Sequence, residues 1–190
     1  MPKLSILICS LYERAGMLSG LLRELHKQID ECNAGEEVEV LTLIDNRERS
    51  TGSKRNELYG KAIGSYSVSV DDDDRIPPYY ISELLKASKE GKDCFAINGV
   101  ITFDGKNEKK WFISKDIPYD TVKEKDGAEW YRRYPNHICP IRSEITKQVK
   151  FQDITIREDY LWATEIHKLG LIKTETIIYH PMYYYDYKTK

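Results

Sequence analysis

Four consecutive aspartates, Asp71 to Asp74, form the densest group of chemically capable side chains in the sequence. Adjacent carboxylates repel one another and raise each other's pKa values unless a cation or water relieves the charge. Mg²⁺ or Mn²⁺ prefers oxygen ligands and keeps coordination positions open for the phosphate oxygens of a substrate. The run therefore predicts a phosphate-handling metal site. We expect Asp73 and Asp71 to be its ligands, Asp74 to support them, and Asp72 to point away.

The residues around the aspartates place them at the end of a strand. β-Branched and small polar residues alternate before Asp71, which predicts a strand over 66–70. Pro77 and Pro78 follow, and proline suits the first turn of a helix. Open α/β sheets bind their ligands at the carboxyl ends of the strands. The aspartates therefore stand where such a sheet would hold a ligand.

The first half of the chain alternates strand and helix patterns. Apolar periodicity predicts strands over 4–9, 38–44 and 66–70, and helices over 13–29, 54–62 and 79–89. We expect residues Thr51 to Ser53 to cap the second helix. This order predicts an α/β fold with a mostly parallel central sheet flanked by helices on both faces.

The second half has a different order, with the change near residues 91–105. Asp104-Gly105 predicts a hairpin turn. We expect a smaller mixed α+β half with strands over 94–103, 110–113, 136–140 and 172–179, a tyrosine-rich tail, and helices over 142–149 and 157–169. We treat residues 1–190 as one domain, because no linker-like segment separates the halves.

The bulk composition excludes several classes of protein. The net charge is −2, so no global field attracts nucleic acid. The four cysteines form no C-x-x-C pair, which favours reduced thiols in a cytoplasmic protein over a zinc site. No run approaches the roughly 20 apolar residues of a membrane span.

Five elements in sequence order resemble nucleotide-sugar glycosyltransferases of the GT-A fold, most closely family 2. They are Ser5–Ser10 with Tyr12–Arg14, Asp45, Lys54–Asn56, Val70–Asp74 with Pro77, and Arg157–Leu161. The last two are similar to the family's D-x-D element and its glutamate-aspartate motif. The chain departs from the family at Cys9, where proline is usual, and at Leu11, which resembles an insertion.

The resemblance implies a GT-A (Rossmann-like) fold, with residues 1–90 as the nucleotide-binding half and 91–190 as the acceptor-side half. It implies transfer of a sugar, with inversion, from a nucleoside-diphosphate donor, UDP-sugar being favoured, assisted by Mn²⁺ or Mg²⁺. Asp159 would be the general base that deprotonates the acceptor hydroxyl, and Glu158 would orient it.

The remaining expected roles concern binding. Asp45 would accept a hydrogen bond from the nucleobase. Donor contacts would come from Ser10, Tyr12, Arg14, Lys54, Arg55 and Asp71. His180 is a candidate third metal ligand, and His137 is a weaker candidate for the donor or acceptor pocket.

Two questions stay open at this point. The chain could instead be a catalytically inactive GT-A-like module that binds a nucleotide or glycan. The acceptor could be a glycan, another hydroxyl-bearing molecule, or modified DNA. A sugar nucleotidyltransferase is disfavoured, because Cys9 to Gly16 contains only one glycine where such enzymes carry a glycine-rich triphosphate loop.

Overall fold

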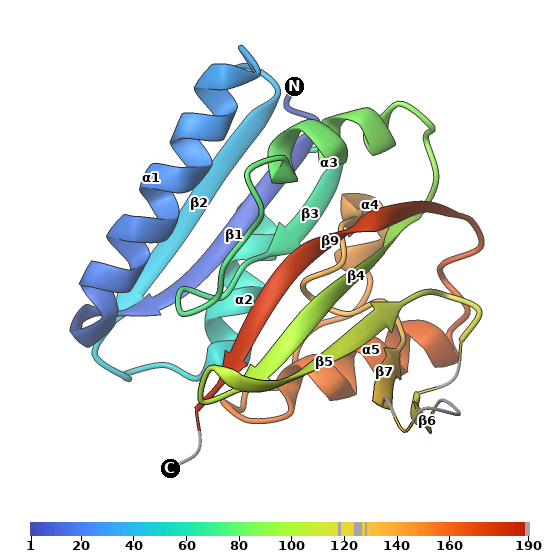
Figure 1. Cartoon of the computed structure of the whole chain (residues 1–190). Coiled ribbons are helices and arrows are strands. Elements are labelled where there is room, and N and C mark those ends of the chain that lie inside the picture. The colour runs from blue at the N-terminus through green and yellow to red at the C-terminus, as the bar shows by residue number, and fades with distance from the viewer. Residues whose placement is uncertain (118, 124–126, 128, 189–190) are drawn as a thin grey trace.

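The computed structural model describes residues 1–117, 119–123, 127 and 129–188 (Figure 1). The strands are β1 Leu4–Leu11, β2 Val38–Asp45, β3 Tyr66–Ser69, β4 Cys94–Phe103, β5 Lys106–Ile113, β6 Asp120–Lys123, β7 Glu129–Arg133, β8 Ile141–Arg142 and β9 Glu175–Tyr187. The helices are a 3₁₀ turn over Tyr12–Arg14, then α1 Ala15–Glu31, α2 Thr51–Lys61, α3 Tyr80–Ser88, α4 Ser143–Thr146 and α5 Glu158–Lys168.

These strands form one mixed sheet in the order β2-β1-β3-β8-β4-β5-β7-β6. The strands β2, β1 and β3 are parallel, which confirms the predicted α/β class with a mostly parallel core. The short strand β8 lies antiparallel between β3 and β4. The strand β9 runs parallel to β4 along its whole length, so β4 joins the two halves of the sheet.

The register of the parallel strands brings their carboxyl ends to one edge. Leu11 of β1 pairs with Asp45 of β2, and Leu7 pairs with Ser69 of β3. The residues that follow Ser69 lead directly into the aspartates. Three of the predicted site segments therefore meet at one edge of the sheet, as expected from the strand order.

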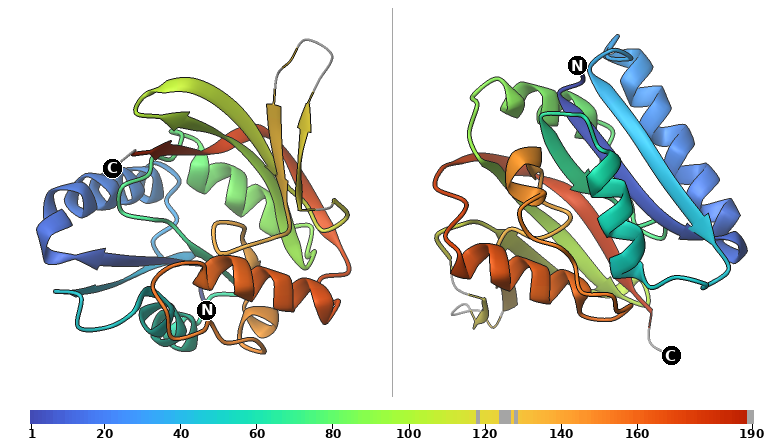
Figure 2. Two further views of the ribbon diagram at one scale, coloured as in Figure 1. Left: turned by 90° about the horizontal axis from the view of Figure 1, so that it is seen from below. Right: turned by 180° about the vertical axis from the view of Figure 1, so that it is seen from behind.

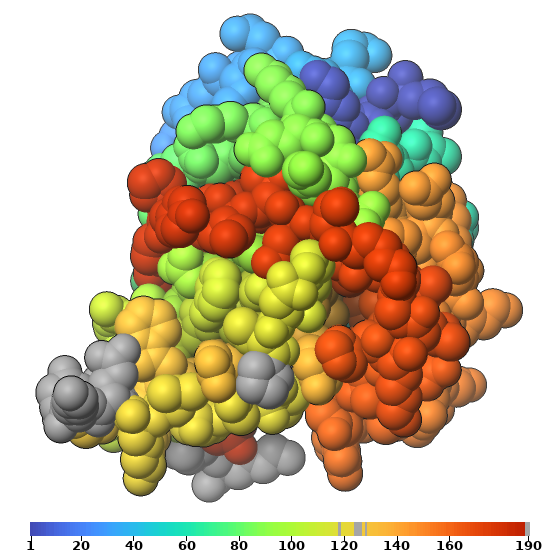
Figure 3. All heavy atoms as spheres, turned by 90° about the vertical axis from the view of Figure 1, so that its right-hand side faces the viewer, coloured from blue at the N-terminus to red at the C-terminus, as the bar shows by residue number. Residues whose placement is uncertain are grey.

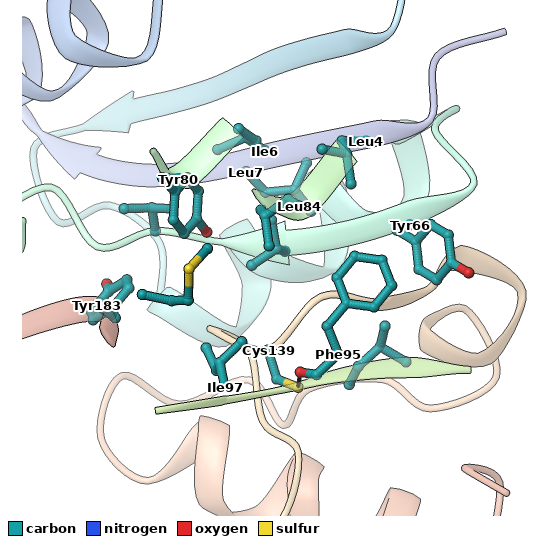
Figure 4. Packing of buried hydrophobic residues seen from close by; sticks show 14 of the residues in the cluster. Leu4, Ile6, Leu7, Tyr66, Tyr80, Leu84, Phe95, Ile97, Cys139 and Tyr183 are labelled. Atoms are coloured by element: carbon teal, nitrogen blue, oxygen red, sulfur yellow. Dashed lines mark hydrogen bonds between the residues drawn. The ribbon is translucent and has the colours of Figure 1, made fainter. Parts of the chain in front are cut away.

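Helices cover both faces of the sheet. Figure 2 shows α1 and α3 on one face and α2, α4 and α5 on the other. Figure 4 shows the core beneath α3, where large buried side chains from β1, β3, β4 and β9 gather. Tyr66 and Phe95 pack there with ring centroids 4.6 Å apart. Among the residues that the structure describes, no helix has both the length and the apolar character needed to cross a membrane.

Several local predictions need correction. Ser50, rather than Thr51–Ser53, is the N-cap of α2, because its hydroxyl accepts a hydrogen bond from the amide of Ser53. The segment 136–140 is a turn and not a strand. In that turn the amide of Cys139 donates to the carbonyl of Asn136, while the carbonyl of His137 accepts from the amide of Ser69.

The other two corrections concern lengths. The predicted helix over 142–149 is only the short α4. Val149 lies beyond its end, and the carbonyl of Val149 accepts a hydrogen bond from the indole nitrogen of Trp162. The tyrosine-rich tail is part of β9, which extends through Tyr187. Aromatic residues favour strands, and the long pairing with β4 gives them a sheet to join.

Candidate active site

The aspartates form a tight turn that β9 holds in place. The amide of Asp74 donates to the carbonyl of Asp71 over 3.2 Å, which closes the turn. The amide of Asp71 donates to the hydroxyl of Tyr183 over 2.9 Å, and Arg75 forms a bridge with Tyr184. A strand more than a hundred residues away in the sequence thus fixes the orientation of the carboxylates.

Asp72 points inward, contrary to expectation. It is 3% exposed and accepts hydrogen bonds from the hydroxyl of Ser10 over 2.5 Å and from Arg14 over 2.7 Å. The second terminal nitrogen of Arg14 contacts the carboxylate of Asp73 at 2.9 Å. Asp72 is drawn inward because these partners offset its burial. Asp73 stays exposed at the surface of the turn.

Asp71 lies beside the buried guanidinium of Arg55. The Nη2 atom of Arg55 is 2.9 Å from Asp71, and its Nε atom is 3.5 Å from the carboxylate of Glu158. Burial acts to raise the pKa of Asp71, but Arg55 and His137 hold it below its usual range. Burial raises the pKa of Glu158. Arg55 therefore balances two carboxylates that come from distant parts of the chain.

Asp74 is the carboxylate of the turn whose burial is least offset by hydrogen bonds or opposite charges. It is buried, and its Oδ1 atom has no hydrogen-bond partner within the described residues. Burial and the charge of Asp71 raise the pKa of Asp74 to about 9. Asp74 is therefore protonated at neutral pH unless a cation binds nearby.

A polar cavity of about 550 Å³ lies over the carboxyl ends of β1 and β3. Most of the predicted site residues line it, together with the loop after β2. Its charged or hydroxyl-bearing lining is Ser10, Arg14, Arg47, Glu48, Arg49, Ser50, Thr51, Lys54, Arg55, Asp71, Asp72, Asp73, Thr155, Glu158 and Tyr185. Guanidinium and ammonium groups beside carboxylates suit a phosphate that arrives with a divalent cation.

Asp45 and Tyr12 do not join this cavity. Asp45 is buried behind it, where its carboxylate accepts from Lys54 at 2.8 Å and from the amides of Arg47 and Arg49. Burial acts to raise the pKa of Asp45, but these hydrogen bonds lower it overall. In the structure Asp45 therefore holds the loop after β2 in place through its hydrogen bonds with the amides of Arg47 and Arg49. Tyr12 is 60% exposed and is absent from the lining of the polar cavity within the described chain.

A second, aromatic cavity of about 310 Å³ adjoins the first. Its aromatic lining is Trp111, Tyr119, Tyr131, Tyr183 and Tyr185. The ionisable lining is Asp71, Asp74, Arg133, His137 and Asp159. The remaining lining residues are Ile101, Ile113, Asn136 and Ile138. Asp71 and Tyr185 line both cavities, so they form the boundary between them.

Gly99 makes room for one wall of the aromatic cavity. A Cβ atom at Gly99 would lie 2.2 Å from the ring of Trp111 and 2.2 Å from the carbonyl of Tyr183. The ring of Trp111 can lie directly against the backbone of β4 because position 99 has no side chain. Opposite it, the guanidinium of Arg133 stacks over the ring of Tyr119 at 4.2 Å. The sequence pattern assigns no functional role to Trp111, Tyr119 or Arg133.

The helix α5 sends its first two residues to different cavities. Glu158 lines the polar cavity, and Asp159 lines the aromatic one. Arg157, just before them, has φ +72°, a left-handed conformation that costs energy for any residue except glycine. Figure 3 shows the face on which α5 and β9 lie beside the segment that carries β5 and β7.

His137 lies between Asp71, a predicted donor and metal contact, and Asp159, the predicted general base. Its Nε2 atom is 3.2 Å from Asp71, and its Nδ1 atom is 3.7 Å from Asp159. The residue is 6% exposed, so its contacts with the two carboxylates are shielded from solvent. The sequence supports His137 only as a weak candidate, and the structure brings it into the centre of the site.

His180 does not join the aspartates. It is exposed on β9, and its ring lies edge-on to Tyr79 with centroids 5.9 Å apart. No three carboxylate, imidazole or thiol side chains of the described chain converge as a ready metal cage. Mg²⁺ commonly binds through one or two carboxylates and completes its coordination with water and substrate phosphates. Asp71 and the exposed Asp73 both line the polar cavity and fit that second kind of site. The next carboxylate, Asp74, keeps a buried Oδ1 atom without a partner in the described chain.

The comparisons with known proteins bear on the fold. No family profile matches the chain, and no curated protein matches it. Among solved structures, TarS 1–349 from S. aureus superposes with a TM-score of 0.61 at 18% identity, covering 97% of this chain and 60% of that one. The same protein in complex with UDP-GlcNAc gives a TM-score of 0.60 at 16% identity, covering 99% and 59%.

The chain has a GT-A-like fold. TarS is a glycosyltransferase of GT-A type, and the superposition extends over nearly the whole of the present chain. A further structure of TarS 1–349, in complex with UDP, gives a TM-score of 0.61 at 18% identity, covering 97% and 60%. The chain spans about three fifths of TarS 1–349, so the comparison covers the shared fold and not the rest of that protein.

Proposed function

We propose that the protein is a glycosyltransferase that moves a sugar from a nucleoside-diphosphate donor, a UDP-sugar in the first instance, to an acceptor hydroxyl with inversion. The observation that carries the proposal is the meeting of two unlike cavities at Asp71. One cavity has the charges that a diphosphate needs, and the other has the aromatic walls that a sugar needs. The TarS complexes with UDP-GlcNAc and UDP support a donor of this class.

The polar cavity would bind the donor. Arg14, Lys54 and Arg55 supply positive charge near the turn, although each also contacts a carboxylate of the protein. A diphosphate would compete for these donors, and Arg55 has a buried Nη1 atom with no partner among the described residues. Asp71, at the boundary, would lie beside the sugar that is transferred.

Mn²⁺ or Mg²⁺ would be held by Asp73 with help from Asp71. Such a cation stabilises the negative charge that forms on a departing diphosphate. Arg14 already contacts both Asp72 and Asp73, so this side chain would orient the Asp73 carboxylate toward the cavity. His180 is left out of this proposal, because it lies against Tyr79 instead.

Asp159 would act as the general base. It lines the aromatic cavity, where an acceptor hydroxyl would enter, and His137 lies between it and Asp71. Glu158 faces Arg55 and not the aromatic cavity, so it would position the Arg55 guanidinium and the start of α5. A base on the opposite side of the sugar from the diphosphate is the arrangement that inversion requires.

An inactive binding module is the alternative. It would retain nucleotide binding without turnover. Asp73 lines the polar cavity, Asp159 lines the aromatic one and Asp71 lies at the boundary between them, which supports the catalytic proposal over the alternative.

The first test is a thermal-shift screen of UDP, GDP, CDP, ADP and dTDP, each with and without Mn²⁺. A ligand that binds the folded state raises its melting temperature. We expect a shift with UDP that depends on Mn²⁺ and disappears in Asp73→Asn, while Asp116→Asn, an exposed aspartate outside the site, keeps it. A shift that persists in Asp73→Asn would remove the metal assignment, and no shift with any nucleotide would remove the donor class.

A further inference from the structure

A third cavity lies on the opposite face of the sheet from the aromatic cavity. It measures about 350 Å³, and its lining comes from β4, β5, β9 and the loop that leads into α3. Val100 and Thr102 line it, whereas Ile101 lines the aromatic cavity. Since successive residues of a strand face opposite sides, the two cavities lie on opposite faces of β4, although Tyr185 of β9 lines both. We call this one the back-face cavity.

Tyrosine rings form much of its wall. Tyr79, Tyr184 and Tyr185 line it together with the apolar Ile76 and Val100. The hydroxyl of Tyr79 donates to the carbonyl of Pro181 over 3.1 Å, which fixes its ring. A flat, partly polar aromatic face binds the apolar face of a sugar ring, and a fixed ring loses little entropy when it does so.

Two charged groups face this cavity without an ion-pair partner. Arg75 and Glu108 are exposed, and neither forms a salt bridge with any residue that the structure describes. Arg75 instead lies over the ring of Tyr184 at 5.7 Å. The guanidinium can only donate hydrogen bonds and the carboxylate can only accept them, so both remain available to a ligand.

The charges identify the kind of ligand. An anion would meet the carboxylate of Glu108, and a cation would meet Arg75, so neither kind suits the whole cavity. A sugar hydroxyl both donates and accepts hydrogen bonds, and it can use both groups at once. A purely apolar chain would leave both charges desolvated, which is costly.

The loop that carries Arg75 is held rigidly. The amide of Arg75 donates to the carbonyl of Tyr184 over 3.0 Å, and the amide of Tyr184 donates back over 2.9 Å. This pair fixes Arg75 and Tyr184 relative to each other before any ligand arrives. It also joins the back-face cavity directly to the aspartate turn, because Arg75 follows Asp74.

We propose that the back-face cavity binds a neutral carbohydrate ring, in a site distinct from the one that carries out transfer. Tyr184 and Tyr79 would stack on the ring, and Arg75 and Glu108 would bind its hydroxyls. Tyr185 lines this cavity as well as the two described above. A glycan held here would keep its other residues near the reaction site, at a raised effective concentration.

The test is calorimetric titration of the purified chain with maltohexaose, cellohexaose, chitohexaose, xylohexaose and mannohexaose. We expect at least one to bind the wild type, and Tyr184→Ala to weaken that binding about tenfold or more. Glu108→Gln, an exposed and nearly isosteric change, is expected to weaken it about threefold. Tyr179→Ala is the matched control, since Tyr179 lies on the same strand, is 81% exposed and lies outside the lining of the back-face cavity.

Three results would overturn the proposal. The first is that none of the five oligosaccharides binds. The second is that binding survives both Tyr184→Ala and Glu108→Gln. The third is that Tyr119→Ala, in the aromatic cavity, abolishes binding while Tyr184→Ala does not. Glu108→Gln keeps the test valid if Tyr184→Ala fails to fold. UDP binding is measured in parallel, so failure of this site is distinguishable from failure of the proposed transfer reaction.

Discussion

The polar cavity and the aromatic cavity share Asp71 as a wall, yet they are built by opposite means. The polar cavity is lined by charged groups that neutralise one another, as Arg14 does with Asp72 and Arg55 does with Asp71. The aromatic cavity is shaped by packing, as where Trp111 lies across Gly99. Charge fixes the first and volume fixes the second, so the two should respond differently to substitution.

The largest expected effect is on transfer and belongs to the aromatic cavity. Asp159→Asn should lower turnover about 10²–10⁴-fold, because the acceptor hydroxyl loses its base. The metal-dependent thermal shift with UDP should remain, since Asp159 does not line the polar cavity. UDP release from UDP-GlcNAc, or from the donor that binds best, measures the change. Glu165→Gln, on an exposed part of the same helix, is the control. Turnover equal to wild type would disprove the role of Asp159.

The second effect is on stability and belongs to the polar cavity. Arg55→Met should lower the free energy of unfolding by about 3–5 kcal/mol, because it removes the buried guanidinium that pairs with both Asp71 and the buried Glu158. Arg133→Met is the matched change in the aromatic cavity, where no ion pair of Arg133 is found among the described residues. It should cost about 1 kcal/mol or less.

Urea denaturation measures both variants. Adding Glu158→Gln to Arg55→Met should recover part of the lost stability, because one of the two stranded charges is then removed. Equal losses in Arg55→Met and Arg133→Met would contradict the division between a charge-built and a packing-built cavity.

The third effect tests packing in the aromatic cavity. Gly99→Ala should lower the free energy of unfolding by about 1–3 kcal/mol, because the new methyl group overlaps Trp111 and the β9 backbone. Gly20→Ala is the control, since nothing lies within 4 Å of a Cβ atom there and alanine favours the helix by roughly 0.5–1 kcal/mol. Thermal unfolding should separate the two variants in opposite directions. An unchanged melting temperature for Gly99→Ala would show that Trp111 yields easily.

The last effect concerns pH and the boundary between the cavities. The pKa of Asp74 is raised to about 9 in the folded protein, so folding favours its protonated form. Its contribution to stability is complete below the unfolded pKa of about 4 and is lost as the pH rises toward 9. Asp74→Asn cannot ionise, so in EDTA it should melt at a higher temperature than wild type at about pH 8. The difference should shrink toward about pH 4, and a constant difference would exclude this titration.

The same division explains what could be predicted from the sequence. The polar cavity is assembled from strand ends and helix starts, so the positions of Ser10, Arg14 and the aspartates followed from local patterns. The inward turn of Asp72 did not, because it depends on partners some sixty residues away in the sequence. The binding of Asp45 by Lys54 and two backbone amides escaped prediction because it depends on how the loop after β2 folds back.

The aromatic cavity was largely out of reach. Trp111, Tyr131 and Tyr183 come from three strands, and only the pairing of β5 with β4 and β7, together with that of β9 with β4, brings them to one place. A buried aromatic residue in a strand has the same sequence pattern whether it faces a core or a cavity. The glycine at position 99 was the available signal, since glycine inside a strand often marks a close approach of another group.

The contact between β9 and the aspartate turn has a consequence for how the chain acquires its activity. The amide of Asp71 and the hydroxyl of Tyr183 are 112 positions apart, and the parallel pairing of β4 with β9 also joins segments far apart in the sequence. Contacts of such long range form slowly during folding. A nascent chain that has emerged from the ribosome only as far as α5 would contain every carboxylate of the site. It would still lack the strand that orients them, and its aspartate turn would not yet be fixed.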